Sequence, residues 1–251
     1  MVAADSLSTA QNLVQIEIEQ GAFENPEAPS HRKVGLPPIP IPFSASSFTQ
    51  KLIPLNDRWA VSSYGQGIIN NKSTYYHMRQ FEKNLDGAWD LSQTVKGLIE
   101  FFENELQKQF PGYDKDAPDD WKPIAFHVNG YEGDDSENRA VTYEVFVGKK
   151  SQSRKQDSIG CTIGGDMPIV QQMWELGRKD KRFEFQFPLM SLQDAVDLCD
   201  FYINTTATFQ RFTNRIPTVG GEVDVALITP FHGFQWLRRK ALMEVLDNGC
   251  D

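Results

Sequence analysis

The order of hydrophobic periodicities along the chain constrains its fold more than any other feature of the sequence. Apolar residues recur at helical spacing in residues 92–110 and again in residues 191–206. Runs typical of β-strands precede, separate and follow these two segments. This order of strands, helix, strands, helix and strands predicts an α+β protein in which the helices cover faces of sheets.

Capping residues and helix breakers mark the ends of the two helical segments. Ser92 is expected to cap the first, and Pro111-Gly112 to end it. Ser191 is expected to cap the second, because Asp194 stands three residues later in the capping-box position. The apolar stripes that would face the sheets are Val95, Leu98, Ile99, Phe102 and Leu106 in the first helix, and Leu192, Ala195, Val196, Cys199, Tyr202 and Ile203 in the second.

Clusters of β-branched and aromatic residues between turn signals predict the strands. Residues 124–131 and 141–147 are expected to form a hairpin across an acidic loop at 132–136. The other expected strands are residues 2–4, 59–64, 158–163, 223–229 and 232–237.

Six of the 14 prolines lie between Pro26 and Pro42, and residues 37–42 read PPIPIP. Proline at this density predicts an extended loop that joins neither a helix nor a sheet. The alternation of proline with isoleucine suggests contact with an apolar surface, such as that of a neighbouring subunit. A solvent-exposed linker fits the pattern about equally well. The few residues ahead of the stretch cannot form a core, so it is interpreted as an insertion, at about 22–48, within a single domain of residues 1–251.

Composition disfavours several classes of function. The chain has 25 Lys+Arg and 34 Asp+Glu, a net charge of −9, whereas a surface that binds duplex nucleic acid carries a basic excess. No apolar run approaches the roughly 18–20 residues of a membrane span, so neither nucleic acid nor a membrane is an expected partner. The first residues, MVAAD, lack the basic and apolar regions of a signal peptide. Three widely spaced cysteines favour a reducing compartment, and a cytoplasmic location is predicted.

The sequence contains no familiar metal or nucleotide motif. The four histidines lack HxH and HExxH spacing, and the glycine pairs at 164–165 and 220–221 belong to neither a GxGxxG nor a P-loop. The acidic clusters at 114–120 and 132–137 lack EF-hand spacing, which favours solvated loops over calcium sites. No metal or cofactor is therefore expected. His127 is interpreted as a core or cross-strand residue whose hydrogen bonds are satisfied.

Four segments carry a resemblance when they are taken in chain order. Residues 2–6 read VAADS, and residues 51–58 read KLIPLNDR, a lysine ahead of an Asn/Asp turn. Residues 60–65 read AVSSYG, a strand that ends in glycine, and residues 220–229 read GGEVDVALIT, a glycine pair ahead of a strand. Together they resemble the proteasome-type family of N-terminal-nucleophile (Ntn) hydrolases, which includes the 20S proteasome subunits and their bacterial relatives. Apart from the proline-rich insertion, the resemblance covers most of the chain.

The resemblance implies a fold, an activity and an assembly. The family fold is a four-layer αββα sandwich of two mostly antiparallel sheets. The activity is that of a threonine-type peptidase, which hydrolyses peptide bonds of a polypeptide substrate with an N-terminal threonine and uses no cofactor. The family packs such domains into rings, so a homo-oligomer is expected by analogy.

The resemblance also implies three catalytic residues, Asp5, Lys51 and Gly65. In the family an Asp and a Lys form a buried pair beside the nucleophile, whose own α-amine acts as the general base. The ammonium of Lys51 would favour the deprotonated amine and the loss of the hydroxyl proton. The backbone N–H at Gly65 would stabilise the oxyanion of the tetrahedral intermediate.

The sequence departs from the family pattern at the nucleophile itself. Residues 1–4 read MVAA, which offers no hydroxyl or thiol, and the first serine, Ser6, follows Asp5. Residues 164–166 read GGD where the family has Gly-Ser-Gly, and residues 216–219 read IPTV where it has an Asp three residues before Ser-Gly-Gly. As given, the chain cannot run the family's reaction.

Three hypotheses follow from these matches and departures. The preferred one is a proteasome-like threonine peptidase subunit that is shortened at its N-terminus and inactive as given. The second is a non-catalytic structural subunit of a ring assembly. The third sets the resemblance aside and treats the chain as an α+β binding module with an apolar proline-rich arm.

Overall fold

The structure is a computed structural model, and it describes residues 1–5, 8–14, 17–20, 32–35, 39–46, 49–133, 138–214 and 216–240. It is a mixed α+β structure with two main antiparallel sheets, the class that the order of periodicities predicts. The helices are α1 (Thr74–Lys83), α2 (Leu91–Gln109), α3 (Tyr113–Asp116), α4 (Pro168–Lys179) and α5 (Leu192–Gln210). The strands are β1 (Val2–Ala4), β2 (Ser8–Val14), β3 (Glu17–Gln20), β4 (Arg32–Gly35), β5 (Ile39–Ser46), β6 (Leu52–Leu55), β7 (Trp59–Gly65), β8 (Ile68–Ile69), β9 (Lys72–Ser73), β10 (Ile124–Glu132), β11 (Arg139–Val147), β12 (Gln152–Gln156), β13 (Asp224–Thr229) and β14 (Gly233–Arg238).

The larger sheet has five strands in the order β12-β11-β10-β7-β6. The predicted hairpin forms its centre, where β10 and β11 pair in register with Ile124 opposite Val147. On its other side β10 pairs with β7, and β7 pairs with β6. Because side chains alternate between the faces of a strand, Phe126 and Val145 share one face of this sheet, and His127 and Glu144 share the other.

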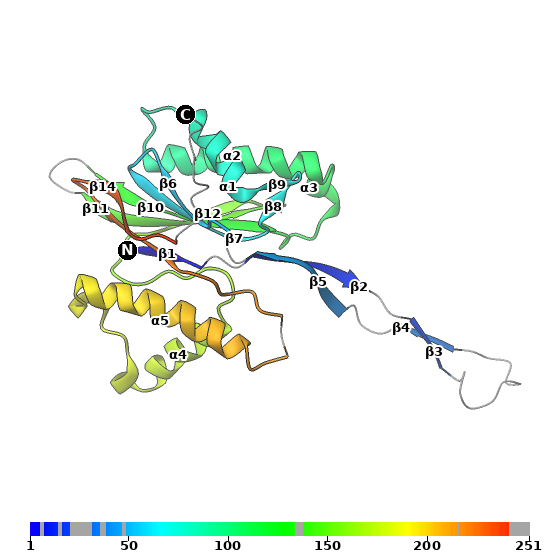
Figure 1. Ribbon diagram of the computed structural model, residues 1–251. Coiled ribbons are helices and arrows are strands. Elements are labelled where there is room, and N and C mark those ends of the chain that lie inside the picture. Colours follow the sequence, from blue (N-terminus) through cyan, green and yellow to red (C-terminus); the bar gives the residue numbers. More distant parts are fainter. Residues whose placement is uncertain are drawn as a thin grey trace, which may run out of the picture.

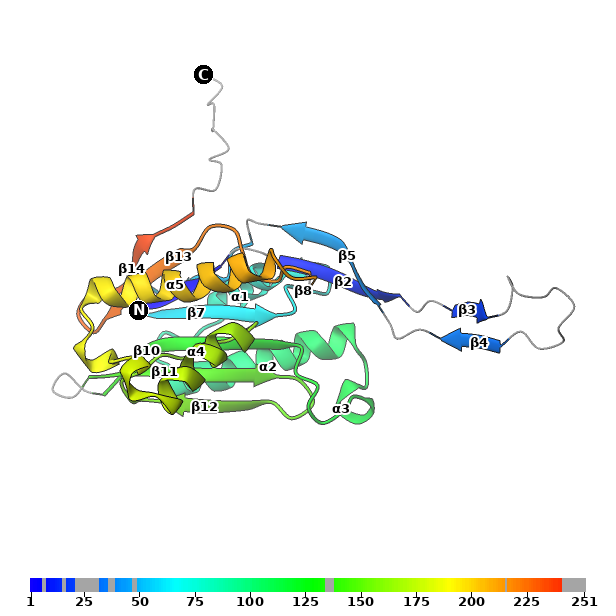
Figure 2. The same cartoon turned by 90° about the horizontal axis from the view of Figure 1, so that it is seen from below.

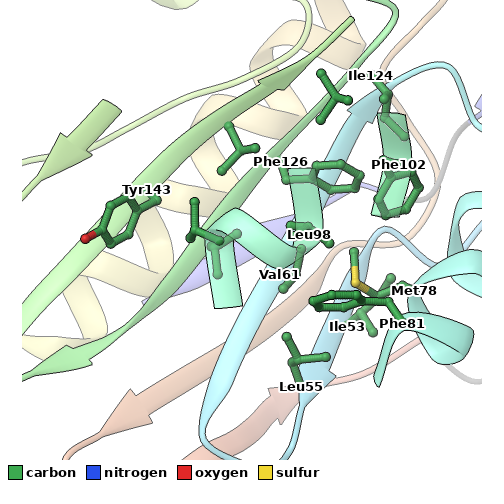
Figure 3. Close-up of a cluster of buried hydrophobic side chains, with 14 of the residues drawn as sticks. Ile53, Leu55, Val61, Met78, Phe81, Leu98, Phe102, Ile124, Phe126 and Tyr143 are labelled. Carbon is green, nitrogen blue, oxygen red and sulfur yellow. The ribbon is translucent and has the colours of Figure 1, made fainter. Parts of the chain in front are cut away.

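The apolar face of the larger sheet packs against α1 and α2. Phe102 of α2 meets Phe126 of β10 with ring centroids 4.7 Å apart (Figure 3), and both side chains are fully buried. Met78 and Phe81 of α1 extend the same cluster. The buried residues of α2 include Val95, Leu98, Phe102 and Leu106, which belong to the predicted apolar stripe.

The smaller sheet has three strands in the order β1-β13-β14. β1 pairs antiparallel with β13, with Val2 opposite Ala226. A second buried cluster joins Val2 and Ala226 of this sheet to Leu52 and Ala60 of the larger sheet. The small side chains in this cluster let the backbones of the two sheets approach each other.

The main helices lie on both sides of the sheets. Figure 1 shows α1 and α2 on one side and α4 and α5 on the other. The predicted second helix is α5, and its capping box between Ser191 and Asp194 is confirmed. None of the helices in the described ranges is long and apolar enough to cross a membrane.

Strands β2–β5, between β1 and β6, form two two-stranded sheets that project from the rest of the molecule (Figures 1 and 2). β2 pairs with β5, and β3 pairs with β4. The prediction that residues 26–42 avoid sheet structure is therefore wrong for β4 and for residues 39–42 of β5; the rest of that stretch lies outside the described residues. Pro40 and Pro42 are two residues apart, so their missing N–H groups fall on the same side of the strand. A two-stranded ribbon tolerates this, because each strand has one edge without ladder bonds.

The expected N-cap of the first helix is corrected by two residues. α2 is capped by Asp90 instead of Ser92. The Asp90 carboxylate accepts the backbone N–H of Gln93, and the Gln93 side chain accepts the backbone N–H of Asp90. Both residues could cap a helix; Asp90 prevails because Gln93 completes the capping box three residues later.

The strand expected at residues 158–163 does not form. These residues are bends and irregular backbone, and the strand that follows β11 is β12, at Gln152–Gln156. β12 comes directly after a turn and occupies the open edge of β11. A segment with the composition of a strand forms one only where the edge of another strand has free backbone N–H and C=O groups to pair with. Residues 158–163 do not pair with a strand edge among the described residues.

Lys240 and Asp224 form a fully buried ion pair, which predicts a large effect of substitution. Their Nζ and Oδ2 atoms are 3.1 Å apart, and each side chain is 1% exposed. Lys240→Met leaves the Asp224 carboxylate buried without its cation, so we expect a loss of about 3–5 kcal/mol in the free energy of unfolding, measured with urea. Lys150→Met removes an exposed cation from Asp119 and is the control, with little expected change. Equal losses in the two variants would contradict the prediction.

Candidate functional site

Asp5 and Lys51, two of the three residues predicted from the resemblance, are in direct contact. Asp5 directly follows β1 and Lys51 directly precedes β6, so the contact joins an end of each sheet. The Nζ atom of Lys51 lies 2.8 Å from Oδ1 of Asp5, and the two side chains are 17% and 13% exposed. At this distance the hydrogen bond is charge-assisted, which makes it stronger than a bond between neutral groups.

The backbone at Gly220 is a further partner of the Asp5 carboxylate. The Gly220 N–H donates to Oδ2 of Asp5 at 3.0 Å, so each carboxylate oxygen accepts a hydrogen bond from a different segment. Gly220 belongs to the glycine pair that precedes β13. The site therefore joins the ends of β1 and β6 to the loop before β13, and it holds one carboxylate and one ammonium in fixed positions.

Gly65, the third predicted residue, is the last residue of β7, the strand next to Lys51. The Ser63 N–H donates to the backbone oxygen of Lys51 at 2.9 Å, and Gly65 lies two residues farther along, about 7 Å along the strand. Gly65 has φ = +89°, and a Cβ atom there would lie 2.4 Å from the backbone oxygen of Pro123. Glycine is thus required by backbone conformation and by the close approach of Pro123.

Sequence reasoning missed the groups that hold the Gly220 loop. The side chains of Gln210, Asp166 and Thr218 meet in one hydrogen-bonded cluster, and the backbone N–H of Thr218 joins it. The glycine pairs at 164–165 and 220–221, which lie one residue before Asp166 and two residues after Thr218, were the available signal. Gln210 itself had none, because a glutamine near the end of a helix is ordinary.

The cysteines among the described residues are poor candidates for a nucleophile. Cys161 and Cys199 are free thiols and partly buried. Burial raises the pKa of the Cys161 thiol to about 12 and raises that of Cys199. The reactive species is the thiolate, so at neutral pH neither side chain is poised to attack a substrate.

A second group of polar residues crosses the face of the larger sheet opposite to α2. Cross-strand pairing places Ser62, His127, Glu144 and Arg154 in one row. The Nε2 atom of His127 is 3.8 Å from Oε1 of Glu144, too far for a hydrogen bond, and the His127 ring lies 5.1 Å from that of Tyr64. The interpretation of His127 as a cross-strand residue is confirmed, but its expected satisfaction is wrong, because Nε2 finds no hydrogen-bond partner among the described residues.

The chemistry available at the site is that of charge and hydrogen bonds. Within the described ranges, no three His, Cys, Asp or Glu side chains come together in a way that would hold a metal ion. Comparison of the sequence with models of protein families and with curated proteins finds no match in either. The function is therefore argued from the geometry around Asp5 and from the residues themselves.

The conformation of Gly65 predicts the effect of a methyl group at the end of β7. Gly65→Ala places a side chain at positive φ against Pro123, and we expect a destabilisation of about 1–3 kcal/mol or more, measured by urea unfolding. Gly87→Ala is the matched control, because nothing lies within 4 Å of the added Cβ atom. An unchanged free energy of unfolding in Gly65→Ala would show that the backbone relaxes freely there.

The buried His127 predicts a specific loss of stability in acid. Desolvation lowers the pKa of His127 to about 4, below the value of about 6.5 in an unfolded chain. The unfolded state then binds the proton more tightly than the folded state. The contribution of neutral His127 to the free energy of unfolding is therefore complete above pH 6.5. It is lost as the pH falls toward 4, by about 3 kcal/mol at most. His127→Phe should remove this part of the pH dependence of urea unfolding, and His232→Gln, at an exposed position, should retain it. If the free energy of unfolding fell equally steeply with pH in His127→Phe and in the unsubstituted chain, His127 would not be the source of this pH dependence.

Proposed function

We propose that this chain is a subunit of the proteasome-type Ntn hydrolase family. The observation that carries the proposal is the contact between Asp5 and Lys51. The two residues are the pair that the resemblance implies; they lie 46 positions apart in the sequence and approach to 2.8 Å. In this family an Asp and a Lys form such a buried pair beside the N-terminal threonine.

The arrangement of the sheets supports the finer fold proposal, a four-layer αββα sandwich. The two antiparallel sheets contact each other through Leu52, Ala60, Val2 and Ala226, and helices lie on both sides. In the described residues β1 has a ladder partner on one edge only, namely β13. The proposal places the nucleophile strand along the other edge of β1.

In the proposed active form, each group at the site has one role. The threonine hydroxyl adds to the carbonyl carbon of the peptide bond, and its proton passes to the α-amine of the same residue. Lys51 stabilises the oxygen that loses this proton, and Asp5 holds Lys51 in place. The N–H at Gly65 donates to the oxyanion, and the amine returns its proton to the leaving nitrogen. Water then hydrolyses the ester that links the acyl group to the threonine.

The second hypothesis, a non-catalytic structural subunit, is favoured by the residues that the chain lacks. Ile216 and Val219 stand where the family has Asp and Ser. Exposed apolar side chains on the side of α4 and α5 fit an interface between subunits; they include Leu189, Phe209 and Phe212, which are 80%, 52% and 83% exposed. The third hypothesis, a binding module, has less support, because the inter-sheet cluster and the Asp5–Lys51 contact are unexplained by it.

The coding sequence upstream of Met1 and a peptidase assay test the first hypothesis. We expect an in-frame segment that begins Met-Thr, or a propeptide that ends Gly-Thr, and hydrolysis of fluorogenic peptides by the extended chain. Lys51→Met in that chain should lower kcat by about 10²–10⁴-fold, because the ammonium acts on the proton transfer. Lys96→Met, on the exposed face of α2, is the matched control. A stop codon directly upstream of Met1 would exclude this form of the proposal.

Assembly into a ring is tested by the native mass of the chain. Both the catalytic and the structural hypothesis predict an oligomer in native mass spectrometry or light scattering. If the proline-rich strand β5 contributes to the contact, Ile39→Ser with Ile41→Ser should lower the oligomer mass or raise the concentration needed for assembly. An unchanged mass would remove β5 from the interface, and a monomer at all concentrations would count against both hypotheses.

A further inference from the structure

Gln210, near the end of α5, has every hydrogen-bonding position of its side-chain amide occupied. Its Oε1 atom accepts the backbone N–H groups of Thr218 and Val219 at 2.9 and 3.1 Å. Its Nε2 atom donates to Oδ2 of Asp166 at 2.9 Å and to Oγ1 of Thr218 at 3.0 Å. Two acceptor bonds and two donor bonds complete the capacity of a glutamine amide. Because the residue is 3% exposed, none of these bonds is readily replaced by water.

The orientation of this amide follows from its partners. Backbone N–H groups can only donate, so they must face the oxygen of Gln210, and a carboxylate oxygen accepts from its nitrogen. Thr218 in turn donates its hydroxyl proton to Oδ2 of Asp166 at 2.8 Å. Asp166 lies between the 164–165 glycine pair and α4, and Thr218 lies two residues before Gly220. Gln210 therefore ties the loop before α4 to the loop before β13.

This cluster is continuous with the Asp5–Lys51 pair through three consecutive residues. The N–H groups of Thr218 and Val219 are held by Gln210, and the next N–H along the chain, that of Gly220, donates to Asp5. Gly220 has no side chain, and it is followed by a second glycine, so the local sequence alone does little to fix the direction of its N–H. The two preceding peptide groups, anchored by Gln210, restrict that direction.

We propose that Gln210, with Asp166 and Thr218, is the positioning device for Asp5. It aims the Gly220 N–H at the carboxylate and so holds Asp5 against Lys51. These residues lie where this chain lacks the Ser and Asp of the family pattern. Asp166 contributes a carboxylate from the loop before α4, Thr218 a hydroxyl from the loop before β13, and Gln210 an amide from α5. The inference rests on the proposed function only in treating Asp5 and Lys51 as the site.

Hydrogen exchange at the Gly220 amide tests the inference without an activity assay. Thr218→Val removes the hydroxyl at nearly constant volume, and Thr218→Ser retains it. Amide exchange resolved at single residues by NMR should show the Gly220 N–H of Thr218→Val exchanging about tenfold faster or more, because a bond to a charged acceptor is weakened. Thr218→Ser should restore the slow rate. The amides of Phe126 and Val128 in β10 report global stability and should be unaffected.

Gln210→Glu is the second variant, because it preserves the acceptor for the two backbone N–H groups and places an oxygen opposite Asp166. We expect the Gly220 amide to exchange faster by a similar factor in this variant. Thr208→Val, at an exposed position of α5, is the control and should leave the exchange rate of Gly220 unchanged. Slow exchange at Gly220 in both Thr218→Val and Gln210→Glu would overturn the inference, as would a Thr218→Ser variant that behaves like Thr218→Val. Faster exchange at Gly220 and in β10 together would also overturn it, since it would indicate general loosening.

The outcome is separate from that of the proposed function. An extended chain without peptidase activity would defeat the catalytic proposal and leave the Gly220 exchange rates as they are. In an active chain, the positioning role predicts that Thr218→Val lowers kcat with little change in KM, whereas Thr218→Ser restores kcat. A change in KM alone in Thr218→Val would contradict that role.

Discussion

The pairing of β1 with β13 joins the first strand of the structure to one that lies more than two hundred residues later, and the smaller sheet, the inter-sheet cluster and the site all depend on it. Val2 opposite Ala226 places two small apolar side chains against Leu52 and Ala60 of the larger sheet. The same register brings Asp5 to Gly220, where the carboxylate accepts the N–H that follows the Gln210-bound turn. Such a contact carries a large cost of loop closure, and it is offset only when burial and hydrogen bonds form together.

The two faces of the larger sheet differ in character: one packs the apolar core and the other carries polar residues. The face toward α1 and α2 is apolar and packed around Phe102 and Phe126, so it supplies stability. The opposite face carries the Ser62–Arg154 row, and the Asp5–Lys51 pair joins the ends of the two sheets. Buried polar groups there are satisfied by one another, as at Gln210, with His127 Nε2 as the exception among the described residues. A polar network that is fully paired favours one arrangement of the loops that carry it.

The elements with strong local signals were predicted well. α2 and α5 follow from their apolar stripes, and the β10–β11 hairpin follows from its two strand-like runs, because amphipathic periodicity is a property of neighbouring residues. Two predictions were wrong for a shared reason. Residues 158–163 have strand composition and no ladder partner, whereas Pro40 and Pro42 have poor strand composition and lie in β5. Whether a segment forms a strand is decided by the edge it meets, and that edge belongs to a distant part of the chain.

The sequence by itself determined the class of the fold and the two long helices, because these follow from the periodicity of neighbouring residues. Asp5 and Lys51 were implied by the resemblance to a known family. Only the tertiary structure decided that Asp5 and Lys51 meet, that Gly65 must be a glycine because of Pro123, and that Gln210 anchors the loop before Gly220. Each of these facts is a distance between segments far apart in the sequence. Such distances are set by how sheets and helices pack, and no local pattern of residues encodes them.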